Sequence, residues 1–325
     1  MIIEETLPQI KKIAPKNQDN FDVIIIGAGP AGMSAALGAG RADMKVLIME
    51  KTLPGGETSA ACNITNYLGF PGGIQGIDLA RKMEDHMFNY EIHYTSETAE
   101  TIKNISDKEK QITTDFGNSY STKSIILATG LESKKLNNPS AVKFLGRGLS
   151  YCAPCDAPLY KDKNIAIIGS GNCACYAADL LSQYAKKIYM VHTSSTIKAV
   201  KSLKKTIMAN SKITMMWDSA IETIFGIDNV EKTKIANSLT GQYTWIDVKG
   251  IFVYIGRVPP EQDFGIEIKK DEKGYIVTDE YMRTNVNGIF AVGDIRAKQI
   301  RQIATAVSDG LVAAVNAERY VAFHG

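Results

Sequence analysis

The sequence has few cysteines, almost no net charge and no apolar leader. Five cysteines in 325 residues are too few for a disulfide scaffold, and this usage indicates a reducing compartment in which we expect any disulfide to be catalytic. Lysine and arginine number 37 against 35 aspartate and glutamate, so the net charge of +2 gives no general reason to expect nucleic acid or membrane as a partner. The first twenty residues lack the apolar core of a signal peptide. We therefore expect a cytoplasmic protein.

One stretch of 18 residues, 23–40, carries no charge and is about as long as a short membrane span. It contains Pro30 and five glycines, which suit a buried strand and a closely packed helix better than a span. The surrounding pattern is an apolar strand at 21–26, a glycine turn at 27–32, a helix of small residues and a second strand at 45–49. This order is typical of a nucleotide-binding βαβ unit.

The same pattern recurs 142 residues later. An apolar strand at 164–168 leads into a turn at 169–174, and a further strand at 187–191 ends at His192, as the corresponding strand of the first copy ends at Glu50. A constant shift between two strand–turn–helix–strand patterns predicts two copies of one nucleotide-binding unit.

Further apolar strands place the second unit within the first. They lie at 124–130, 250–256 and 288–294, before an apolar helix at about 300–320. The simplest architecture is α/β, with two doubly wound (Rossmann-like) domains. We predict one domain from 21–131 plus 251–325, with a second domain, 132–250, inserted into it. Residues 1–20 form an N-terminal extension.

The first glycine turn carries the complete dinucleotide fingerprint. Gly27, Gly29 and Gly32 follow a strand and precede a helix, and Glu50 ends the next strand. The glycines allow a pyrophosphate to approach the helix N-terminus, and the carboxylate accepts a hydrogen bond from a ribose hydroxyl. Asp294, at the end of a later strand, can bind a ribityl hydroxyl. This combination favours FAD over NAD in the first unit.

The second fingerprint is incomplete. Gly169, Gly171 and Ala174 keep the small residues of a phosphate turn, but the following strand ends at His192, where an NAD site has an acid and an NADP site has a nearby arginine. Lys198 could reach a phosphate only as a point charge. We therefore expect this unit to keep the fold without useful nicotinamide binding, which makes NADPH doubtful.

Cys152 and Cys155 form a C-x-x-C motif between the two fingerprints. This spacing can close a small disulfide ring and lowers a thiol pKa toward the thiolate that exchange requires. A zinc half-site is the alternative, but it needs a second ligand pair. We expect Cys62, Cys173 and Cys175 to be small buried apolar residues.

Residues 180–217 contain no acid. Their seven lysines are Lys186, Lys187, Lys198, Lys201, Lys204, Lys205 and Lys212. Such a run is either a solvated face or a docking surface for an acidic partner or for nucleotide phosphates. Lys198, Lys201 and Lys205 share one helical face by their spacing.

Together these features resemble the low-molecular-weight flavoprotein thioredoxin reductases, over residues 21–320. The most specific pieces are 152–156, Val292-Gly-Asp294, 301–306 and the Gly55-Gly56-Glu57 turn. The resemblance implies homodimers that carry FAD and no metal. It implies a flavin site made of Gly27, Gly29, Pro30, Ala31, Gly32, Glu50, Lys51, Gly55, Gly56, Glu57, Asn66, Gly130, Gly293, Asp294, Arg301, Gln302 and Ile303.

The resemblance also implies catalytic roles. Cys155 corresponds to the thiol that lies against the flavin ring, and Cys152 to the interchange thiol that attacks the disulfide of thioredoxin. Asp156 corresponds to the acid that protonates a departing thiolate.

Two departures point away from NADPH. The family's His-Arg-Arg segment is His192-Thr193-Ser194 here, and the acids of the second fingerprint helix are missing from 172–177. These losses resemble the ferredoxin-dependent flavin thioredoxin reductases, in which reduced ferredoxin, an acidic protein, supplies electrons. The lysine-rich run is then expected to be a ferredoxin-docking surface, through Lys186, Lys187, Lys198, Lys201 and Lys205.

We therefore predict a thioredoxin-disulfide reductase that passes electrons from ferredoxin through FAD and the Cys152–Cys155 pair to thioredoxin. An ordinary NADPH-dependent thioredoxin reductase is one alternative. A dithiol oxidase of the same fold, using oxygen, is another, although Asp156 stands where such oxidases carry histidine. A non-enzymatic flavin redox sensor is a third.

Overall fold

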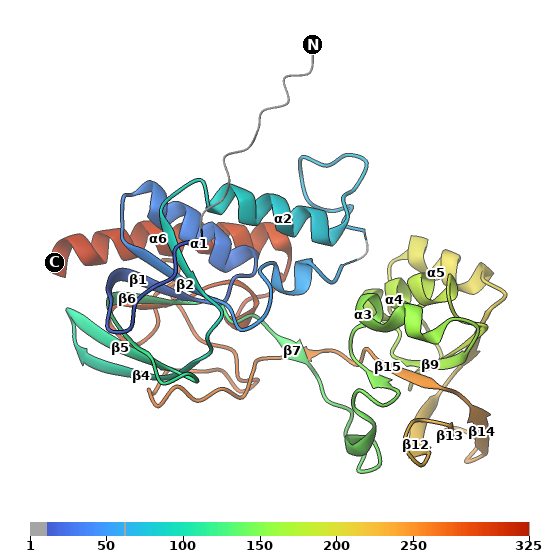
Figure 1. The fold of residues 1–325 in the computed structure, drawn as a ribbon. Coiled ribbons are helices and arrows are strands. Elements are labelled where there is room, and N and C mark those ends of the chain that lie inside the picture. The colour runs from blue at the N-terminus through green and yellow to red at the C-terminus, as the bar shows by residue number, and fades with distance from the viewer. Residues whose placement is uncertain (1–11, 62, 325) are drawn as a thin grey trace. The chain divides into compact units, whose positions relative to one another are not determined.

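The computed structural model describes residues 12–61 and 63–324, which divide into two compact units (Figure 1). Glu132–Val258 forms the second unit, and the described residues before it join those from Pro259 onward to form the first. The sequence placed the second boundary at residue 250. That boundary is too early, because β15 (Gly250–Val253) pairs in parallel with β9 (Asn164–Ile168) and so belongs to the second sheet.

The first unit is built on a seven-stranded sheet whose main order is β3-β2-β1-β6-β5-β4, with β17 beside β6. Its strands are β1 (Asn20–Ile26), β2 (Val46–Met49), β3 (Ile92–Thr95), β4 (Ala99–Ser106), β5 (Glu109–Thr114), β6 (Ser119–Leu127) and β17 (Ile289–Ala291). The strands β3, β2, β1, β6 and β17 pair in parallel, whereas β4 and β5 are antiparallel. The central parallel strands are apolar on both faces because both faces are covered.

Helices cover one face of this sheet (Figure 1). They are α1 (Pro30–Arg41), α2 (Gly76–Met87) and α6 (Ile303–His324), and short 3₁₀ turns lie at Gly56–Thr58 and Gly293–Ile295. The helices α1 and α6 touch closely because small residues face each other: a Cβ on Gly310 would lie 2.2 Å from the carbonyl oxygen of Ala31. Apolar residues of β4, β5 and the chain around Phe264 pack on the opposite face.

The second unit has a parallel five-stranded sheet of order β11-β10-β9-β15-β8 and a separate antiparallel sheet, β12-β13-β14. The further strands are β8 (Leu149–Ser150), β10 (Lys187–Val191), β11 (Ile213–Met216), β12 (Ser219–Phe225), β13 (Lys232–Asn237) and β14 (Tyr243–Asp247). The short strands β7 (Glu132–Ser133) and β16 (Arg257–Val258) pair at the two ends of the unit.

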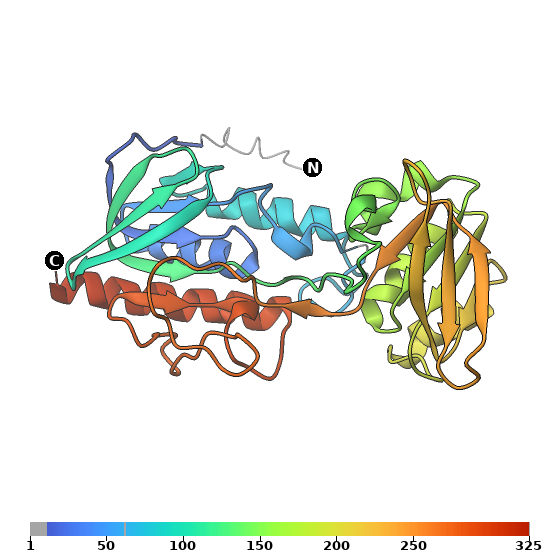
Figure 2. The same cartoon turned by 90° about the horizontal axis from the view of Figure 1, so that it is seen from below.

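The helices of the second unit are α3 (Ala153–Asp156), α4 (Asn172–Ser182) and α5 (Lys201–Ala209), with 3₁₀ turns at Val142–Phe144 and Ala157–Tyr160. Residues of all three helices share one core with β9, and the antiparallel sheet packs against the other face of the parallel sheet. Figure 2 shows the green helices and the orange strands of this unit. Each unit therefore has a group of parallel strands between two layers, which confirms the predicted class of two doubly wound α/β units.

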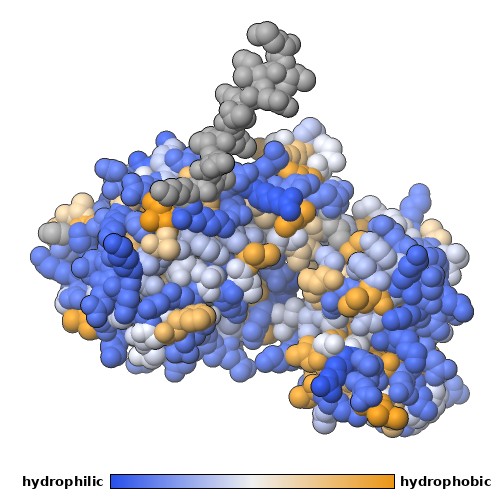
Figure 3. All heavy atoms as spheres, viewed as in Figure 1, coloured by the Kyte–Doolittle hydropathy of each residue, from blue (hydrophilic) through white to orange (hydrophobic). Residues whose placement is uncertain are grey.

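The apolar stretch at 23–40 consists of most of β1, the glycine turn and nearly all of α1. Among the helices of the described chain, none is both long and apolar enough to cross a membrane. Hydrophilic residues cover most of the face in Figure 3, where apolar residues form small separate groups. A cytoplasmic location stays a prediction.

Candidate active site

The glycine turn after β1 leaves the N-terminus of α1 open. Gly27 has φ +106°, and a Cβ there would lie 2.4 Å from the carbonyl oxygen of Ala128. A Cβ on Gly32 would lie 1.8 Å from the carbonyl oxygen of Gly27, whereas one on Gly29 would meet nothing within 4 Å. No side chain caps α1, and its first turn contains no acid. The outer glycines therefore allow close packing, and the N–H groups at the uncapped start of the helix suit a pyrophosphate.

Glu50 is the carboxylate that belongs to this turn. It is only 9% exposed, and its Oε2 accepts a hydrogen bond from the backbone N–H of Ala28 at 2.9 Å. Its Oε1 accepts hydrogen bonds from the N–H and the hydroxyl of Thr52, at 3.0 and 2.9 Å. The backbone therefore holds the predicted ribose-binding residue beside the turn, while Lys51 is exposed.

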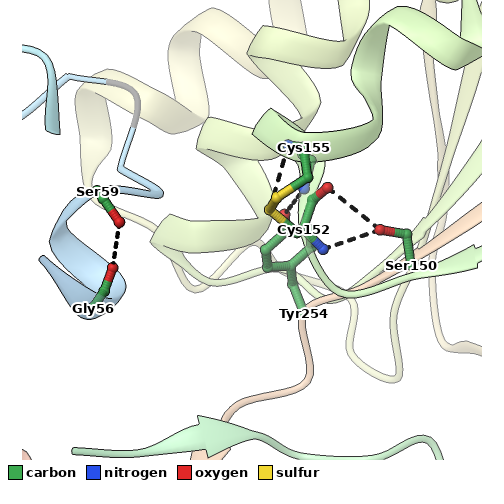
Figure 4. The surroundings of a disulfide bond; sticks show 7 residues. Gly56, Ser59, Ser150, Cys152, Cys155 and Tyr254 are labelled. Carbon is green, nitrogen blue, oxygen red and sulfur yellow. Dashed lines mark hydrogen bonds between the residues drawn. A yellow bond between two sulfur atoms is a disulfide. The ribbon is translucent and has the colours of Figure 1, made fainter. Parts of the chain in front are cut away.

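A second glycine turn folds back onto the first. The N–H of Gly55 donates to the carbonyl oxygen of Ala28 at 2.7 Å, and a Cβ on Gly56 would lie 3.4 Å from the Cα of Gly29. The hydroxyl of Ser59 donates to the carbonyl oxygen of Gly56 at 2.6 Å and closes this turn (Figure 4). The predicted residues 55–57 thus lie next to the fingerprint turn, and Glu57 is exposed.

The loop after β17 joins the same region. A Cβ on Gly293 would lie 2.9 Å from the Cβ of Ala31, in the first turn of α1. The guanidinium of Arg301 donates to the carbonyl oxygen of Asp294 at 3.2 Å. The side-chain amide of Asn66 donates to Gln302, although 236 positions separate the two residues.

The remaining predicted residues are at the ends of elements: Gly130 follows β6 with φ +64°, and Ile303 begins α6. The first unit therefore brings these predicted segments together around the open end of α1. That they bind a cofactor stays a prediction at the level of single residues.

Cys152 and Cys155 form a disulfide, with 5.4 Å between their Cα atoms (Figure 4). The N–H of Cys155 points to the Sγ of Cys152 at 3.3 Å, and the N–H of Cys152 donates to the hydroxyl of Ser150 at 3.0 Å. The hydroxyl of Tyr254 accepts a hydrogen bond from the N–H of Ala153 at 2.8 Å. These bonds tie the motif to the second unit, and Cys155 is exposed while Cys152 is half-buried.

Asp156 follows directly at the end of α3 and is half-buried. Its charge, together with burial as the larger cause, raises the pKa of Tyr160. Within 12–61 and 63–324, no three His, Cys, Asp or Glu residues gather so that they could hold a metal ion.

The other cysteines differ from one another. Cys175 is buried as predicted, and burial raises its pKa to about 11. The prediction that Cys173 is buried was wrong, because Cys173 is exposed. Residues two apart point to nearly opposite sides of a helix, so only one of the pair faces the core. Cys62 lies outside the described residues.

The glycine turn after β9 has the same backbone design as the first. A Cβ on Gly169 would lie 2.2 Å from the carbonyl oxygen of Tyr254, and one on Gly171 would meet nothing within 4 Å. No side chain caps α4, and Ala174 is completely buried. The second turn could therefore admit a phosphate on geometry alone.

The residue that follows β10 is His192, whereas an acid, Glu50, follows β2 in the first unit. His192 is 4% exposed, neither ring nitrogen has a hydrogen-bond partner among the described residues, and its ring meets Trp217 edge-on at 4.8 Å. Burial lowers its pKa, and Lys198 lowers it further, while Asp218 opposes the shift. A neutral histidine offers no charge to a 2′-phosphate.

The lysine-rich run folds into β10, α5 and their flanks. Lys187 is half-buried, and the other six lysines are exposed. Lys201 begins α5, whose first turn contains no acid although a helix N-terminus favours negative charge. Within the described part of the chain none of the seven forms an ion pair. The run is therefore a solvated, uncompensated positive surface.

The sequence reasoning missed one charged group of the first unit. Asp309 of α6 forms buried ion pairs with Arg296 and Lys298, next to the turn at Gly293. The available signal was an acid in the middle of the predicted helix, since Asp309 is the one charged residue of positions 302–317.

Comparison with known proteins places the chain in a family. The model of the pyridine nucleotide-disulphide oxidoreductases matches residues 21–310, and the chain belongs to this family. The thioredoxin reductase of Listeria innocua is 39% identical over 302 residues, which are 93% of this chain and 94% of that protein. The solved thioredoxin reductase of Lactococcus lactis is 37% identical, with a TM-score of 0.87 over 93% of this chain and 99% of that one.

These likenesses confirm the resemblance to the low-molecular-weight thioredoxin reductases. A ferredoxin-flavin thioredoxin reductase from Clostridium acetobutylicum is a more distant match: it is 31% identical, with a TM-score of 0.52 over 94% of this chain and 99% of that one. Thioredoxin reductases of this family use FAD, and the open end of α1 with the buried Glu50 fits that cofactor.

Proposed function

We propose that this protein reduces the disulfide of thioredoxin through the Cys152–Cys155 pair, using FAD and electrons from reduced ferredoxin. The observation that carries the proposal is the disulfide itself: it closes a C-x-x-C ring at the start of α3, has Asp156 directly after it and includes an exposed cysteine. Exposed disulfides are typically the labile or catalytic ones, whereas structural disulfides resist reduction.

The first unit supplies the cofactor site. The N-terminal turn of α1 would hold the pyrophosphate, Glu50 a ribose and Asp294 the ribityl chain, with Arg301 and Gln302 beside the ring. FAD, when bound, supplies the two electrons that open the disulfide.

The chemistry of the reduced pair then balances through thiol exchange. The Cys152 thiolate attacks the disulfide of thioredoxin, which breaks that bond and forms a mixed disulfide. The Cys155 thiolate attacks the sulfur of Cys152, which restores the ring and releases the second thiolate of thioredoxin, and Asp156 gives that leaving group its proton. The N–H of Cys155, 3.3 Å from the Sγ of Cys152, would stabilise a thiolate there and supports Cys152 as the attacking group.

Single serine variants test these roles. The probe is a single-cysteine thioredoxin whose thiol is held as a mixed disulfide with thionitrobenzoate. The Cys152 thiolate of reduced Cys155→Ser should attack it, release thionitrobenzoate and form a stable mixed disulfide with thioredoxin, whereas Cys152→Ser should form none, as measured by mass spectrometry. Both variants should lose thioredoxin reduction. Cys173→Ser is the matched control and should keep it. Trapping by Cys152→Ser instead would exchange the two roles, and full activity of both variants would refute the proposal.

The electron donor is the finer part of the proposal. The neutral, buried His192, the absence of arginine beside it and the uncompensated lysines support ferredoxin rather than NADPH. The similarity to proteins named simply thioredoxin reductase favours NADPH as the alternative. Mixing the protein with reduced ferredoxin, NADPH or NADH and following flavin absorbance separates the two. Ferredoxin should bleach the flavin, and rapid bleaching by NADPH would restore the NADPH-dependent reading.

The lysines of α5 would form the ferredoxin-docking surface. Lys201→Glu and Lys205→Glu should slow flavin reduction by ferredoxin, and the wild-type rate should fall with added salt, because exposed charges act over about 10 Å at 0.1 M ionic strength. Lys249→Glu, at another exposed lysine of the second unit, is the matched control. Equal rates of flavin reduction by ferredoxin in all three variants would show that the lysines of α5 do not bind ferredoxin.

A homodimer is the expected assembly. The apolar residues Leu311 and Val315 of α6 are 51% and 37% exposed in the single chain, which supports a partner on this helix. Analytical ultracentrifugation of the holoprotein would give a mass of one chain if this expectation is wrong.

A further inference from the structure

A buried group of charged side chains lies where α6 meets the loop after β17. Asp309, in the second turn of α6, is 7% exposed. Its Oδ1 accepts a hydrogen bond from Nη1 of Arg296 at 2.9 Å, and its Oδ2 accepts one from Nζ of Lys298 at 2.9 Å. The side chains of these two cations are only 14% and 10% exposed. One helix carboxylate thus forms ion pairs with two mostly buried cations of the loop.

The same carboxylate holds the backbone of the turn that carries Asp294. The N–H of Gly293 donates to Oδ2 of Asp309 at 3.1 Å. Gly293 has φ +74° and approaches the first turn of α1 so closely that a Cβ would meet Ala31 at 2.9 Å. Lys298 lies between the two acids, with its Nζ 3.9 Å from the Oδ1 of Asp294. The group therefore reaches the predicted cofactor-binding carboxylate by two routes, one through the backbone and one through a lysine.

We propose that Asp309 is a positioning residue for the flavin site. Through the Gly293 N–H and Lys298 it holds the carboxylate of Asp294 where that carboxylate binds a ribityl hydroxyl of FAD. The inference rests on the role of Asp294 proposed above. Burying ions costs solvation energy that apolar packing would avoid, so such a group is weak as a source of stability. Directional hydrogen bonds between charged groups do, however, hold the loop between β17 and α6 in one conformation.

The Asp309→Asn variant tests the proposal because it keeps the shape of the side chain and removes its charge. The dissociation constant of FAD is measured on the refolded or deflavinated protein by flavin fluorescence, with the visible absorption of the bound flavin as a second signature. Loss of a hydrogen bond to a charged group predicts an increase of about 10- to 100-fold in this constant. The absorption bands of the bound flavin should shift as well.

Asn316→Ala is the matched control. Asn316 is 6% exposed in the same helix, and its amide donates only within α6, to the carbonyl oxygen of Val312 at 2.8 Å. This variant should lower the melting temperature and leave the FAD dissociation constant unchanged. If Asp309→Asn lowers only the melting temperature, as Asn316→Ala does, then its role is structural and the proposal fails.

A double-mutant cycle with Asp294→Ala identifies the route. If Asp309 acts through Asp294, then Asp309→Asn should change the FAD dissociation constant much less in the Asp294→Ala background than in the wild type. Fully additive effects would overturn the proposal. If Asp294→Ala alone leaves FAD binding unchanged, the assignment of Asp294 fails instead, and that result differs from a failure of Asp309 alone.

Discussion

The two glycine turns have nearly the same backbone and different electrostatics. After β1, the buried carboxylate of Glu50 accepts hydrogen bonds from the turn and from Thr52. After β9, His192 takes the corresponding position with both ring nitrogens unpartnered among the described residues. Glycine geometry and strand packing preserve the fold in both units. The side chain at the end of the second strand differs without loss of the fold, and we propose that it decides whether a dinucleotide binds.

The largest effect should come from the third position of the turn. A Cβ at Gly32 would lie 1.8 Å from the carbonyl oxygen of Gly27, so Gly32→Ala must displace backbone. We expect loss of bound FAD and a fall of about 3 kcal/mol or more in the free energy of unfolding. The equivalent residue of the second turn is Ala174, and Ala174→Gly should cost only about 1 kcal/mol and leave FAD in place. The flavin-to-protein ratio measures bound FAD, and denaturant unfolding measures stability. Equal losses in Gly32→Ala and Ala174→Gly would contradict the difference between the two turns.

The next largest effect should come from Glu50, the residue predicted to bind the ribose. Glu50→Gln keeps the size of the side chain but replaces one accepting oxygen by an amide that cannot accept, so Ala28 or Thr52 loses its partner. The FAD dissociation constant should rise about 10- to 100-fold, in titrations of the deflavinated protein. His192→Gln, the matched change in the second unit, should leave this constant unchanged. An unaltered constant in Glu50→Gln would show that Glu50 only supports the turn.

A smaller effect should appear in the pH dependence of the stability of the second unit. Because burial lowers the pKa of His192, the unfolded state binds more protons than the folded state between the folded value and about 6.5. The stability that neutral His192 contributes is complete above about pH 6.5 and is lost as the pH falls toward its folded pKa. His192→Phe should therefore show a shallower loss of stability on acidification. Tryptophan fluorescence reports this, since both tryptophans, Trp217 and Trp245, lie in the second unit. An identical acid dependence would assign the slope to another group.

The smallest effect is a rate of alkylation. Cys173 lies in the open first turn of α4, where it corresponds to Ala31 of the first turn, and it should react with iodoacetamide before the buried Cys175. If the second turn binds no nicotinamide nucleotide, then added NADPH should not slow this reaction. Peptide mass spectrometry measures each cysteine separately. Protection of Cys173 by NADPH would show that the second turn still binds the nucleotide, although His192 stands where a ribose-binding residue is expected.

Much of this architecture could be predicted because its signals are local. The strands at 21–26 and 164–168 are runs of β-branched residues, the turns after them need glycine, and the constant shift marks a repeated unit. The C-x-x-C pair likewise brings its own geometry, since three residues of a helical turn place the two sulfur atoms together. In each case the residues that decide the structure are neighbours in the chain.

Other features could not be read from the chain in this way. The sequence placed β15 with the first domain, because the strand looks the same whichever sheet it joins, and only its pairing with β9 and β8 assigns it. The exposure of Cys173 depends on which side of α4 faces the sheet. The ion pairs of Asp309 depend on how far the loop before α6 folds back on that helix.

By itself, then, the sequence determined that this chain carries two nucleotide-type folds, one complete fingerprint and one redox-spaced cysteine pair. Tertiary structure alone decided that Glu50 is held by the turn, that the buried His192 ring has no hydrogen-bond partner among the described residues, and that Asp309 supports the turn before Asp294. The physical reason is distance along the chain. Local geometry follows from spacing, but burial, pairing and the charge around a group are set by residues that only folding brings together.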